Sequence, residues 1–377
     1  MRFYDTFTRT KKEFTPLNGS KISMYVCGIT PNNATHMGHA FTYVAFDALV
    51  RYLTFKRYEV TYVQNATDVN DSDDVISQAK KMGKTWREVA DMWIGHFNTQ
   101  MKSLNVLPPN HYVLASSAVE KIISINMDLI KKGHAYEKNG NVYFSVSSFS
   151  KYGSLSRFSP EQMLIISQER GNNPQDPNKV NPLDFVLWVQ SDSEPFWESP
   201  WGRGRPGWHI ECTAMIHEYL GEQIDIHGGG RDLIFPHHES EIAQSEGYTG
   251  KKPYVNFWMH NGMVMYEGEK MSKSLGNLVL VEDMLRKYRP NSLRWYLLSH
   301  HYRQPWEFIE DELESVDDKI SKLEGRLTSP DAGTWEEIET LLDDDFDTPE
   351  ALRYLCDHTA GSTAKKALDL LGFTFQQ

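Results

Sequence analysis

The N-terminal part of the chain alternates between two patterns of apolar and polar residues. Residues 21–27 are mostly apolar and predict a buried strand. Residues 58–65 predict a second strand. Between them, a helix from about Thr35 is predicted by apolar residues in steps of three and four: Met37, Phe41, Val44, Ala45, Ala48, Leu49 and Tyr52. Strand, helix and strand form a βαβ unit, which implies a parallel sheet and an α/β fold class.

The pattern of apolar and polar residues changes twice along the remainder of the chain. Helical patterns run through residues 85–104 and 117–133. From about 135 to 205, short strand-like pieces mix with many Ser, Pro, Asn and Gly residues, which indicates an insertion between two halves of one α/β domain. A helix over about 208–219 begins the second half, and residues 281–377 are predicted to be mainly helical.

Composition narrows the class of protein. The chain has 377 residues, 40% hydrophobic and 12% aromatic, which is typical of a globular protein with a large core. No run of 18 apolar residues and no apolar leader are evident, so we expect neither a membrane span nor a signal peptide. Three cysteines do not suggest a disulfide framework, so a cytoplasmic location with reduced thiols is expected. The net charge of −12 argues against a large nucleic-acid surface but leaves room for a local basic patch.

Two histidines stand near the start of the first predicted helix. His36 and His39 are three residues apart and share one helical face, and Gly38 between them lets a ligand approach the backbone. A helix N-terminus attracts anions, so these imidazoles suit the phosphates of ATP and a pentavalent α-phosphorus. The alternative is a capped helix with two ordinary histidines.

A second candidate phosphate site is the pentapeptide Lys-Met-Ser-Lys-Ser at 270–274. It lies between Gly268 and Gly276 and is predicted to be a mobile loop. Lys270 and Lys273 are placed to hold the β- and γ-phosphates as pyrophosphate leaves. A solvated basic loop is the alternative, but the pairing of this loop with the histidine motif favours a phosphate site.

Four further residues make a candidate metal site. Cys27 ends the first predicted strand, Cys212 lies on or beside a predicted helix, and His237 and Glu241 are four apart, so one helical face presents both. Two thiols, an imidazole and a carboxylate are a plausible zinc set. The alternative is a pair of buried structural cysteines and a helix-capping His-Glu pair. Cys356 has no ligand neighbours in the sequence and is expected to play no part.

A glycine run offers a weaker indication. His227 is followed by Gly228, Gly229 and Gly230 directly after a short predicted strand. Three glycines would leave a flat surface open to an adenine or ribose, although a glycine-rich turn alone is not specific.

With these motifs in view, the chain resembles the catalytic core of a class I aminoacyl-tRNA synthetase of the cysteine type. The motifs that carry the resemblance are His-Met-Gly-His, Lys-Met-Ser-Lys-Ser, Tyr-Val-Cys-Gly, Gly-Trp-His-Ile-Glu-Cys and Gly-Gly-Gly-Arg-Asp-Leu-Ile-Phe-Pro-His-His-Glu. The resemblance covers residues 1–310 densely and the helical tail loosely. It implies a Rossmann-like catalytic domain of the HUP type, with a parallel sheet, an inserted connective region and a C-terminal helical domain.

The resemblance also implies domain boundaries. We expect residues 1–112 and 206–260 for the two halves of the catalytic domain, 113–205 for the connective insertion, 261–310 for the Lys-Met-Ser-Lys-Ser loop with a stem-contact-like region, and 311–377 for a helical C-terminal domain without an anticodon-binding domain.

Site roles follow from the resemblance by motif match. One zinc ion per chain is expected at the four residues named above, and ATP is expected as a substrate together with Mg²⁺. The residues expected around the substrate cysteine are Cys27, Thr67 and Trp208. Those expected around ATP are Thr30, His36, His39, Gly228, Gly229, Gly230, Lys270 and Lys273, of which His36, His39, Lys270 and Lys273 are the expected catalytic residues.

Two branches of this family differ in the acceptor of the activated cysteine. Cys-Gly-Ile-Thr-Pro at 27–31, His-His-Tyr-Arg-Gln-Pro-Trp-Glu at 300–307 and the absence of room for an anticodon domain resemble the mycothiol cysteine ligase, which joins cysteine to the amine of glucosaminyl-inositol. Glu241 in the zinc set and the surrounding Glu-Ser-Glu-Ile-Ala-Gln-Ser-Glu resemble the cysteine–tRNA ligase instead.

The sequence therefore predicts an ATP-dependent, AMP-forming cysteine ligase. The amino sugar is the preferred acceptor and tRNA the alternative, with cysteine and ATP as the other partners, no membrane partner and a monomeric state. A non-catalytic synthetase paralogue is disfavoured because both ATP motifs are intact. A different nucleotidyl transferase of the same fold would need no zinc set.

Overall fold

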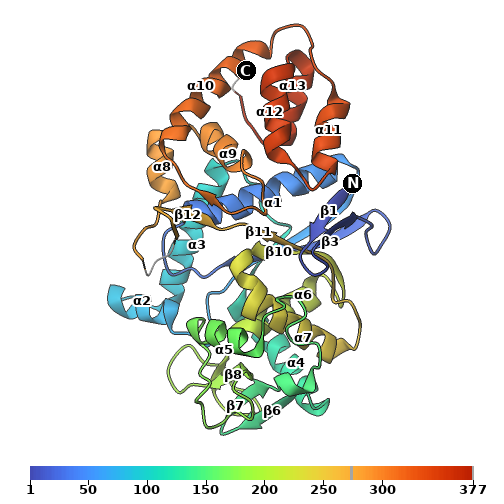
Figure 1. Ribbon diagram of the computed structural model, residues 1–377. Coiled ribbons are helices and arrows are strands. Elements are labelled where there is room, and N and C mark those ends of the chain that lie inside the picture. The colour runs from blue at the N-terminus through green and yellow to red at the C-terminus, as the bar shows by residue number, and fades with distance from the viewer. Residues whose placement is uncertain (272–274, 376–377) are drawn as a thin grey trace.

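A parallel five-stranded sheet forms the centre of the protein (Figure 1). The computed structural model describes residues 1–271 and 275–375. From edge to edge, the strands are β11 (Val255–Asn261), β10 (Ile224–Gly230), β3 (Lys21–Ile29), β4 (Glu59–Ala66) and β5 (His111–Leu114). The chain builds outward from β3 to β5 and later places β10 and β11 on the other side of β3, so the order of the strands reverses between β3 and β10.

The predicted βαβ unit is confirmed. β3 and β4 pair in parallel from Lys21 opposite Glu59 to Ile29 opposite Ala66, and the helix between them is α1 (Met37–Phe55). The helix begins after His36, which is its N-cap, because the His36 side chain accepts a hydrogen bond from the backbone N–H of Gly38.

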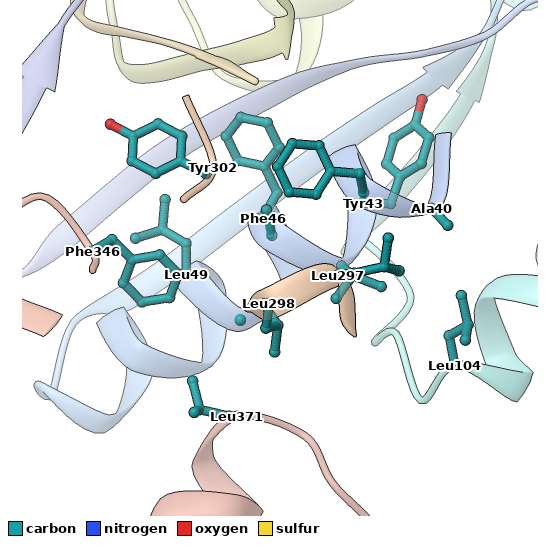
Figure 2. Close-up of a cluster of buried hydrophobic side chains, with 14 of the residues drawn as sticks. Ala40, Tyr43, Phe46, Leu49, Leu104, Leu297, Leu298, Tyr302, Phe346 and Leu371 are labelled. Atoms are coloured by element: carbon teal, nitrogen blue, oxygen red, sulfur yellow. The ribbon is translucent and has the colours of Figure 1, made fainter. Parts of the chain in front are cut away.

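Helix α1 is buried along most of its length. Figure 2 shows side chains from its successive turns packed against α9 (Pro290–Leu298), the segment after α3 (Trp86–Ser103) and the C-terminal segment. The labelled members of this cluster are Ala40, Tyr43, Phe46, Leu49, Leu104, Leu297, Leu298, Tyr302, Phe346 and Leu371. Because residues far apart in sequence cover it, α1 joins α9 and the C-terminal segment to the central sheet.

A separate antiparallel sheet comes from the stretch of mixed character. Its strands are β6 (Ala135–Lys138), β7 (Asn141–Phe144), β8 (Phe185–Gln190) and β9 (Gly204–Pro206). It lies between β5 and α6 (Trp208–Tyr219) in the chain, so it interrupts the parallel sheet in sequence, and Figure 1 shows it below that sheet with α4 (Val119–Lys131) and α5 (Pro160–Glu169). The domain boundaries given above stay predictions.

Smaller elements complete the fold. They are the hairpin β1 (Arg2–Asp5) and β2 (Thr10–Glu13), helix α2 (Asp74–Met82), the 3₁₀ turns η1 (Ala115–Ala118), η2 (Val146–Ser148) and η3 (Arg231–Leu233), the π-type turn η4 (Ile234–His238), helix α7 (Glu239–Thr249), the strands β12 (Val264–Tyr266), β13 (Glu269–Lys270) and β14 (Trp306–Glu307), and helices α8 (Val281–Lys287), α10 (Asp311–Arg326), α11 (Trp335–Asp343), α12 (Thr348–His358) and α13 (Gly361–Leu370). In the part of the chain that the structure describes, no helix is both long and apolar enough to cross a bilayer.

A buried ion pair joins α1 to the C-terminal half. The Arg294 guanidinium donates to Asp47 of α1, to the carbonyl of Leu371 at 2.6 Å and to the carbonyl of Leu104 at 2.8 Å. Asp47 also accepts from the backbone N–H of Leu107 at 2.8 Å. Both charged side chains are 1% exposed, so each depends on the other for compensation.

The substitution Asp47→Asn tests this pair. It leaves the Arg294 guanidinium buried without its carboxylate, and we expect the free energy of unfolding to fall by about 3–5 kcal/mol. Urea denaturation followed by circular dichroism would measure the loss. The matched control is Asp344→Asn, which removes an exposed carboxylate paired with Lys11 and should change the free energy by less than about 1 kcal/mol. Equal effects of the two substitutions would contradict the role of the buried pair.

Candidate active site

A cavity of about 450 Å³ opens at the carboxyl ends of β3 and β10. These two strands are the neighbours between which the strand order reverses, and a crevice outside the carboxyl ends at such a point is the usual ligand site of open α/β sheets. The residues predicted from sequence that line the cavity are Cys27, Thr30, His36, His39, Thr67, Trp208, Cys212, Gly230, His237 and Lys270. The tertiary structure therefore gathers, from five separate segments, most of the residues that the motifs identified.

The end of β3 that carries Cys27 contains a bulge. The register between β3 and β4 shifts between Val26 and Ile29. Gly28 lies in this bulge, its N–H donates to the Asn65 side chain at 2.7 Å, and a Cβ at this position would overlap the carbonyl group of Asn65. Only glycine fits such a close approach of two backbones, so the glycine after Cys27 has a steric reason.

The four predicted metal ligands form one buried cluster. The Sγ atoms of Cys27 and Cys212 are 3.9 Å apart, and Nε2 of His237 lies 3.4 Å from Sγ of Cys212. Oε1 of Glu241 lies 3.1 Å from that nitrogen and 4.0 Å from Sγ of Cys27. His237 belongs to η4 and Glu241 to α7, which continues it, so the spacing of four residues brings both side chains to one side.

These distances fit a tetrahedral zinc ion. Zn–S bonds of about 2.3 Å and Zn–N or Zn–O bonds of about 2.1 Å imply ligand–ligand separations of about 3.4–3.8 Å, and the observed values lie within a few tenths of an ångström of that range. Burial raises the pKa of the Cys27 thiol and of the Glu241 carboxyl, so a cation held between them would offset the cost of ionising both groups.

A second ligand set, which was not predicted from the sequence, shares two of these residues. His227 and His238 lie with Cys27 and Glu241 in a group whose donor atoms are all within 4.8 Å of one another. Nε2 of His238 is 3.2 Å from Sγ of Cys27, and Nε2 of His227 is 2.9 Å from Glu241. The spacing of three residues between His238 and Glu241 could have identified His238. The set with Cys212 is the one that faces the cavity, because both Cys212 and His237 line it.

Neighbouring rings hold His237 in place. Trp208 stacks on it with ring centroids 4.7 Å apart and an interplanar angle of 18°. Nδ1 of His237 and Nδ1 of His209 are 3.0 Å apart, and burial lowers the pKa of His209 to about 3, so that ring is neutral and can accept a hydrogen bond from His237. When His237 donates through Nδ1 in this contact, its Nε2 carries no proton and is free to bind a metal.

His36 and His39 cap α1 and stack on each other. Their ring centroids are 3.8 Å apart; Nδ1 of His36 accepts from the N–H of Gly38 at 3.1 Å, and Nδ1 of His39 accepts from the N–H of His36 at 3.4 Å. Burial lowers the pKa of His39 to about 4 and the pKa of His36 well below its usual value, so both rings are neutral at pH 7. A neutral ring that accepts at Nδ1 carries its proton on Nε2, so both rings keep an N–H donor for a ligand.

Lys270 is held at the cavity by Asp232, a residue that the motif analysis did not single out. The Nζ atom of Lys270 is 2.8 Å from Oδ2 of Asp232, and Arg170 reaches the same oxygen at 3.3 Å. Burial alone would raise the pKa of Asp232, but the effect of the two cations is larger, so the pKa is lowered. Lys273, the other predicted lysine, lies outside the described residues.

The glycine run differs in part from the expectation. Gly230 lines the cavity, but Gly228 and Gly229 are buried inside β10 and do not line it. A Cβ on Gly228 would overlap the ring of Phe46, and one on Gly229 would lie 2.9 Å from Leu233. These two glycines therefore permit close packing of α1 and η3 on the strand; an open surface for a nucleotide is present only at Gly230.

The fold defines a class of protein. The structure superimposes on a methionyl-tRNA synthetase of Mycobacterium tuberculosis in complex with methionyl-adenylate with a TM-score of 0.66, over 89% of this chain and 81% of that one, at 16% identity. It also matches a putative arginyl-tRNA synthetase of Campylobacter jejuni with a TM-score of 0.59, over 96% of this chain and 95% of that one, at 13% identity. The architecture is that of class I synthetases, with a Rossmann-like parallel sheet.

Sequence comparison gives the family. Residues 13–318 match the model of the class I (C) tRNA synthetase catalytic domain, and the chain belongs to that family. It is 45% identical to a cysteine–tRNA ligase of Dehalococcoides mccartyi over 95% of this chain and 79% of the relative. It is 43% identical to a cysteine–tRNA ligase of Geobacter metallireducens over 95% of this chain and 77% of that relative. The chain is thus an ATP-dependent amino-acid ligase, as the motifs predict.

Metal content tests the ligand cluster. We expect the purified chain to carry zinc and Cys212→Ala to lose it, because one of two thiolates is removed. Inductively coupled plasma mass spectrometry would measure the bound metal. Cys356→Ala is the control, since Cys356 is half-buried and lies apart from the cluster. His237→Gln should also lose the metal; retention there, with loss in His238→Gln, would assign the metal to the second ligand set.

The lowered pKa of His39 predicts how the free energy of unfolding depends on pH. Its pKa is about 4 in the folded protein but about 6.5 in an unfolded chain, so the unfolded state takes up the proton first as pH falls. The contribution of His39 to stability is therefore complete above about pH 6.5 and is lost as pH falls towards 4. We expect His39→Gln to reduce the fall in unfolding free energy between pH 7 and pH 5, measured by urea denaturation.

The control for this prediction is His358→Gln, at the exposed end of α12. It should leave the pH dependence of the wild type unchanged. A His39→Gln protein that loses as much stability as the wild type over this pH range would contradict the assignment of a neutral buried ring.

Proposed function

We propose that this protein is a cysteine–tRNA ligase that forms cysteinyl-adenylate and transfers cysteine to the terminal hydroxyl of a tRNA. One observation carries the proposal: the sulfur-rich metal cluster and the ATP motifs open onto a single cavity. Cys212 and His237 of the cluster line that cavity, and so do His36, His39 and Lys270 of the two motifs. A thiol substrate bound at the cluster would therefore meet a nucleotide bound at the motifs.

In the first step, the carboxylate of cysteine attacks the α-phosphorus of ATP and pyrophosphate leaves. The Nε2–H groups of His36 and His39 are the chain's donors for the charge that develops at the α-phosphate. Lys270 supplies a cation for the departing phosphates, and its contact with Asp232 fixes the ammonium group beforehand. Mg²⁺ is expected to accompany the nucleotide.

In the second step, the acceptor hydroxyl attacks the carbonyl carbon of the mixed anhydride and AMP leaves. The ester bond forms as the bond from the carbonyl carbon to the phosphate oxygen breaks, and the hydroxyl proton is released. In this step the protein would hold the adenylate in position. Thr30, Thr67 and Trp208 line the cavity, where a bound substrate would contact them.

Selection of cysteine over serine would come from the metal cluster. Bound zinc would hold the substrate sulfur as a thiolate, a softer ligand than the hydroxyl of serine. Such a contact would discriminate more strongly than a difference of one methylene, which is worth about 1–3 kcal/mol in an apolar pocket. Cys27, Cys212, His237 and Glu241 would hold the ion, and Trp208 would fix the ring of His237 by stacking on it.

The proposed acceptor, tRNA, differs from the amino sugar that the sequence alone favours. That preference rests largely on the length of the chain. The relatives at 43–45% identity are named as cysteine–tRNA ligases and cover this chain almost throughout, which favours RNA over the amino sugar. Glu241 in the metal cluster agrees with the same branch.

Product analysis by mass spectrometry tests the acceptor. The protein is incubated with ATP, Mg²⁺ and cysteine, together with cysteine tRNA in one tube and glucosaminyl-inositol in another. We expect cysteinyl-tRNA and an unmodified sugar. An amide-linked cysteinyl sugar with bare tRNA would overturn the proposal and restore the amino-sugar acceptor. Serine in place of cysteine is the control and should give neither product.

A further inference from the structure

Asn65 lies between the metal cluster and Thr67 in the cavity of the candidate active site. It stands near the carboxyl end of β4, it is 1% exposed, and it lines the cavity together with Thr67 and Cys212. Its side chain makes hydrogen bonds in two directions, to Gly28 beside the cluster and to Thr67. A single amide therefore connects two regions to which the proposed function assigns contacts with the substrate cysteine.

The bulge in β3 explains why a side chain is needed at this position. Residues 27 and 28 of β3 face the single residue Asn65 of β4, so the regular ladder is interrupted there. The N–H of Gly28 donates instead to Oδ1 of Asn65 at 2.7 Å. The carbonyl of the preceding residue, Cys27, accepts from the Tyr43 hydroxyl at 3.0 Å. Two side chains that line the cavity thus hold the strand end that carries Cys27.

The bond to Gly28 determines which end of the Asn65 amide faces Thr67. A backbone N–H can only donate, so the group that it meets is the amide oxygen. The amide nitrogen therefore faces Thr67 and donates to its hydroxyl oxygen at 3.2 Å. The backbone of Thr67 is fixed as well, because its N–H donates to the carbonyl of Ile29 at 2.9 Å. The position of the Thr67 hydroxyl is thus set relative to the end of β3.

The oxygen of the same amide lies close to the metal cluster. Oδ1 of Asn65 is 3.9 Å from Sγ of Cys212, and Sγ of Cys27 is 3.9 Å from that sulfur. Asn65 is not one of the four candidate metal ligands, so it would act on the separation between the cluster and Thr67 rather than on the metal. Such a separation matters because a shift of about 1 Å in a bound reactant can change a rate about a hundredfold.

We propose that Asn65 is a positioning residue that sets the distance between the metal cluster and the Thr67 hydroxyl, and that this distance matches the length of cysteine. A cysteine whose sulfur is bound at the cluster would place its backbone end against Thr67, whereas an amino acid longer by one methylene would not fit both contacts at once. The inference rests on the proposed function, because it assumes that the substrate is cysteine. It adds selection by length to the selection of a thiol by the metal.

The test compares cysteine with homocysteine, which is longer by one methylene, in ATP–pyrophosphate exchange. Asn65→Leu keeps the branched shape of the side chain and removes both hydrogen bonds. We expect the KM for cysteine to rise about tenfold and the ratio of kcat/KM for cysteine to that for homocysteine to fall about tenfold, with the KM for ATP unchanged. This ratio does not depend on the fraction of folded protein, so a loss of stability alone would not alter it.

Two measurements that do not depend on catalysis accompany this test. Calorimetric titration of the zinc-loaded chain with cysteine should show a rise in Kd of about tenfold in Asn65→Leu. The zinc content, measured by inductively coupled plasma mass spectrometry, should equal that of the wild type, because all four candidate ligands remain. Asn65→Ala lacks the same two hydrogen bonds and has a smaller side chain, and it should repeat both results if Asn65→Leu does not fold.

Further variants separate positioning from a general structural effect. Asn126→Leu removes a fully buried asparagine of α4 that donates to the carbonyl of Leu187 at 3.2 Å and does not line the cavity, so it should lower stability but leave the ratio unchanged. Thr67→Val removes the hydroxyl that Asn65 contacts. Adding Asn65→Leu to Thr67→Val should change the KM for cysteine by less than about twofold, because no hydroxyl is left to position.

Other results would overturn the inference. Equal losses for cysteine and homocysteine in the Asn65 variants would make the role of Asn65 purely structural. Loss of zinc from these variants would make Asn65 a support of the metal ligands, and losses that multiply in the double variant would show that it does not act through Thr67. A wild-type chain without cysteine-dependent pyrophosphate exchange would end the proposed function itself, whatever the variants show.

Discussion

The parallel pairing of β3 with β10 is the constraint on which the site depends. The register places Met24, Tyr25 and Val26 opposite Ile226, His227 and Gly228, so the ends of the two strands lie side by side. Cys27 follows on one strand and Gly230 ends the other, and the cavity opens between them. Without this pairing, the thiol, the histidine motif and the turns that carry the remaining ligands would have no common position.

Helix α1 connects the cavity to the hydrophobic core of the protein. Its first turn presents His36 and His39 to the cavity, while its later turns are buried against α9 and the C-terminal segment (Figure 2). The pair between Asp47 and Arg294 adds a directional contact to this apolar packing. The helix that carries His36 and His39 is therefore held from its far side, where substitutions can change stability without touching the cavity.

The Asp232 carboxylate lines both the cavity of the candidate active site and a second, arginine-lined cavity, and it pairs with one cation from each. Asp232 pairs with Lys270 on the side of the first cavity and with Arg170 on the side of the second. Neither cation is left without a counter-charge, because Asp232 is the partner of both. A single acidic residue therefore holds both cations in position at the boundary between the two cavities.

The sequence by itself determined the βαβ unit, the motifs and the four candidate metal ligands, because these depend on local periodicity and on residue types whose chemistry is specific. It did not reveal His227 and His238 beside the cluster, the packing role of Gly228 and Gly229, or the arginine-lined cavity. Those features join side chains from distant segments, and no spacing along the chain encodes which strand ends meet. Only the tertiary structure, through the order of the parallel strands, decided them.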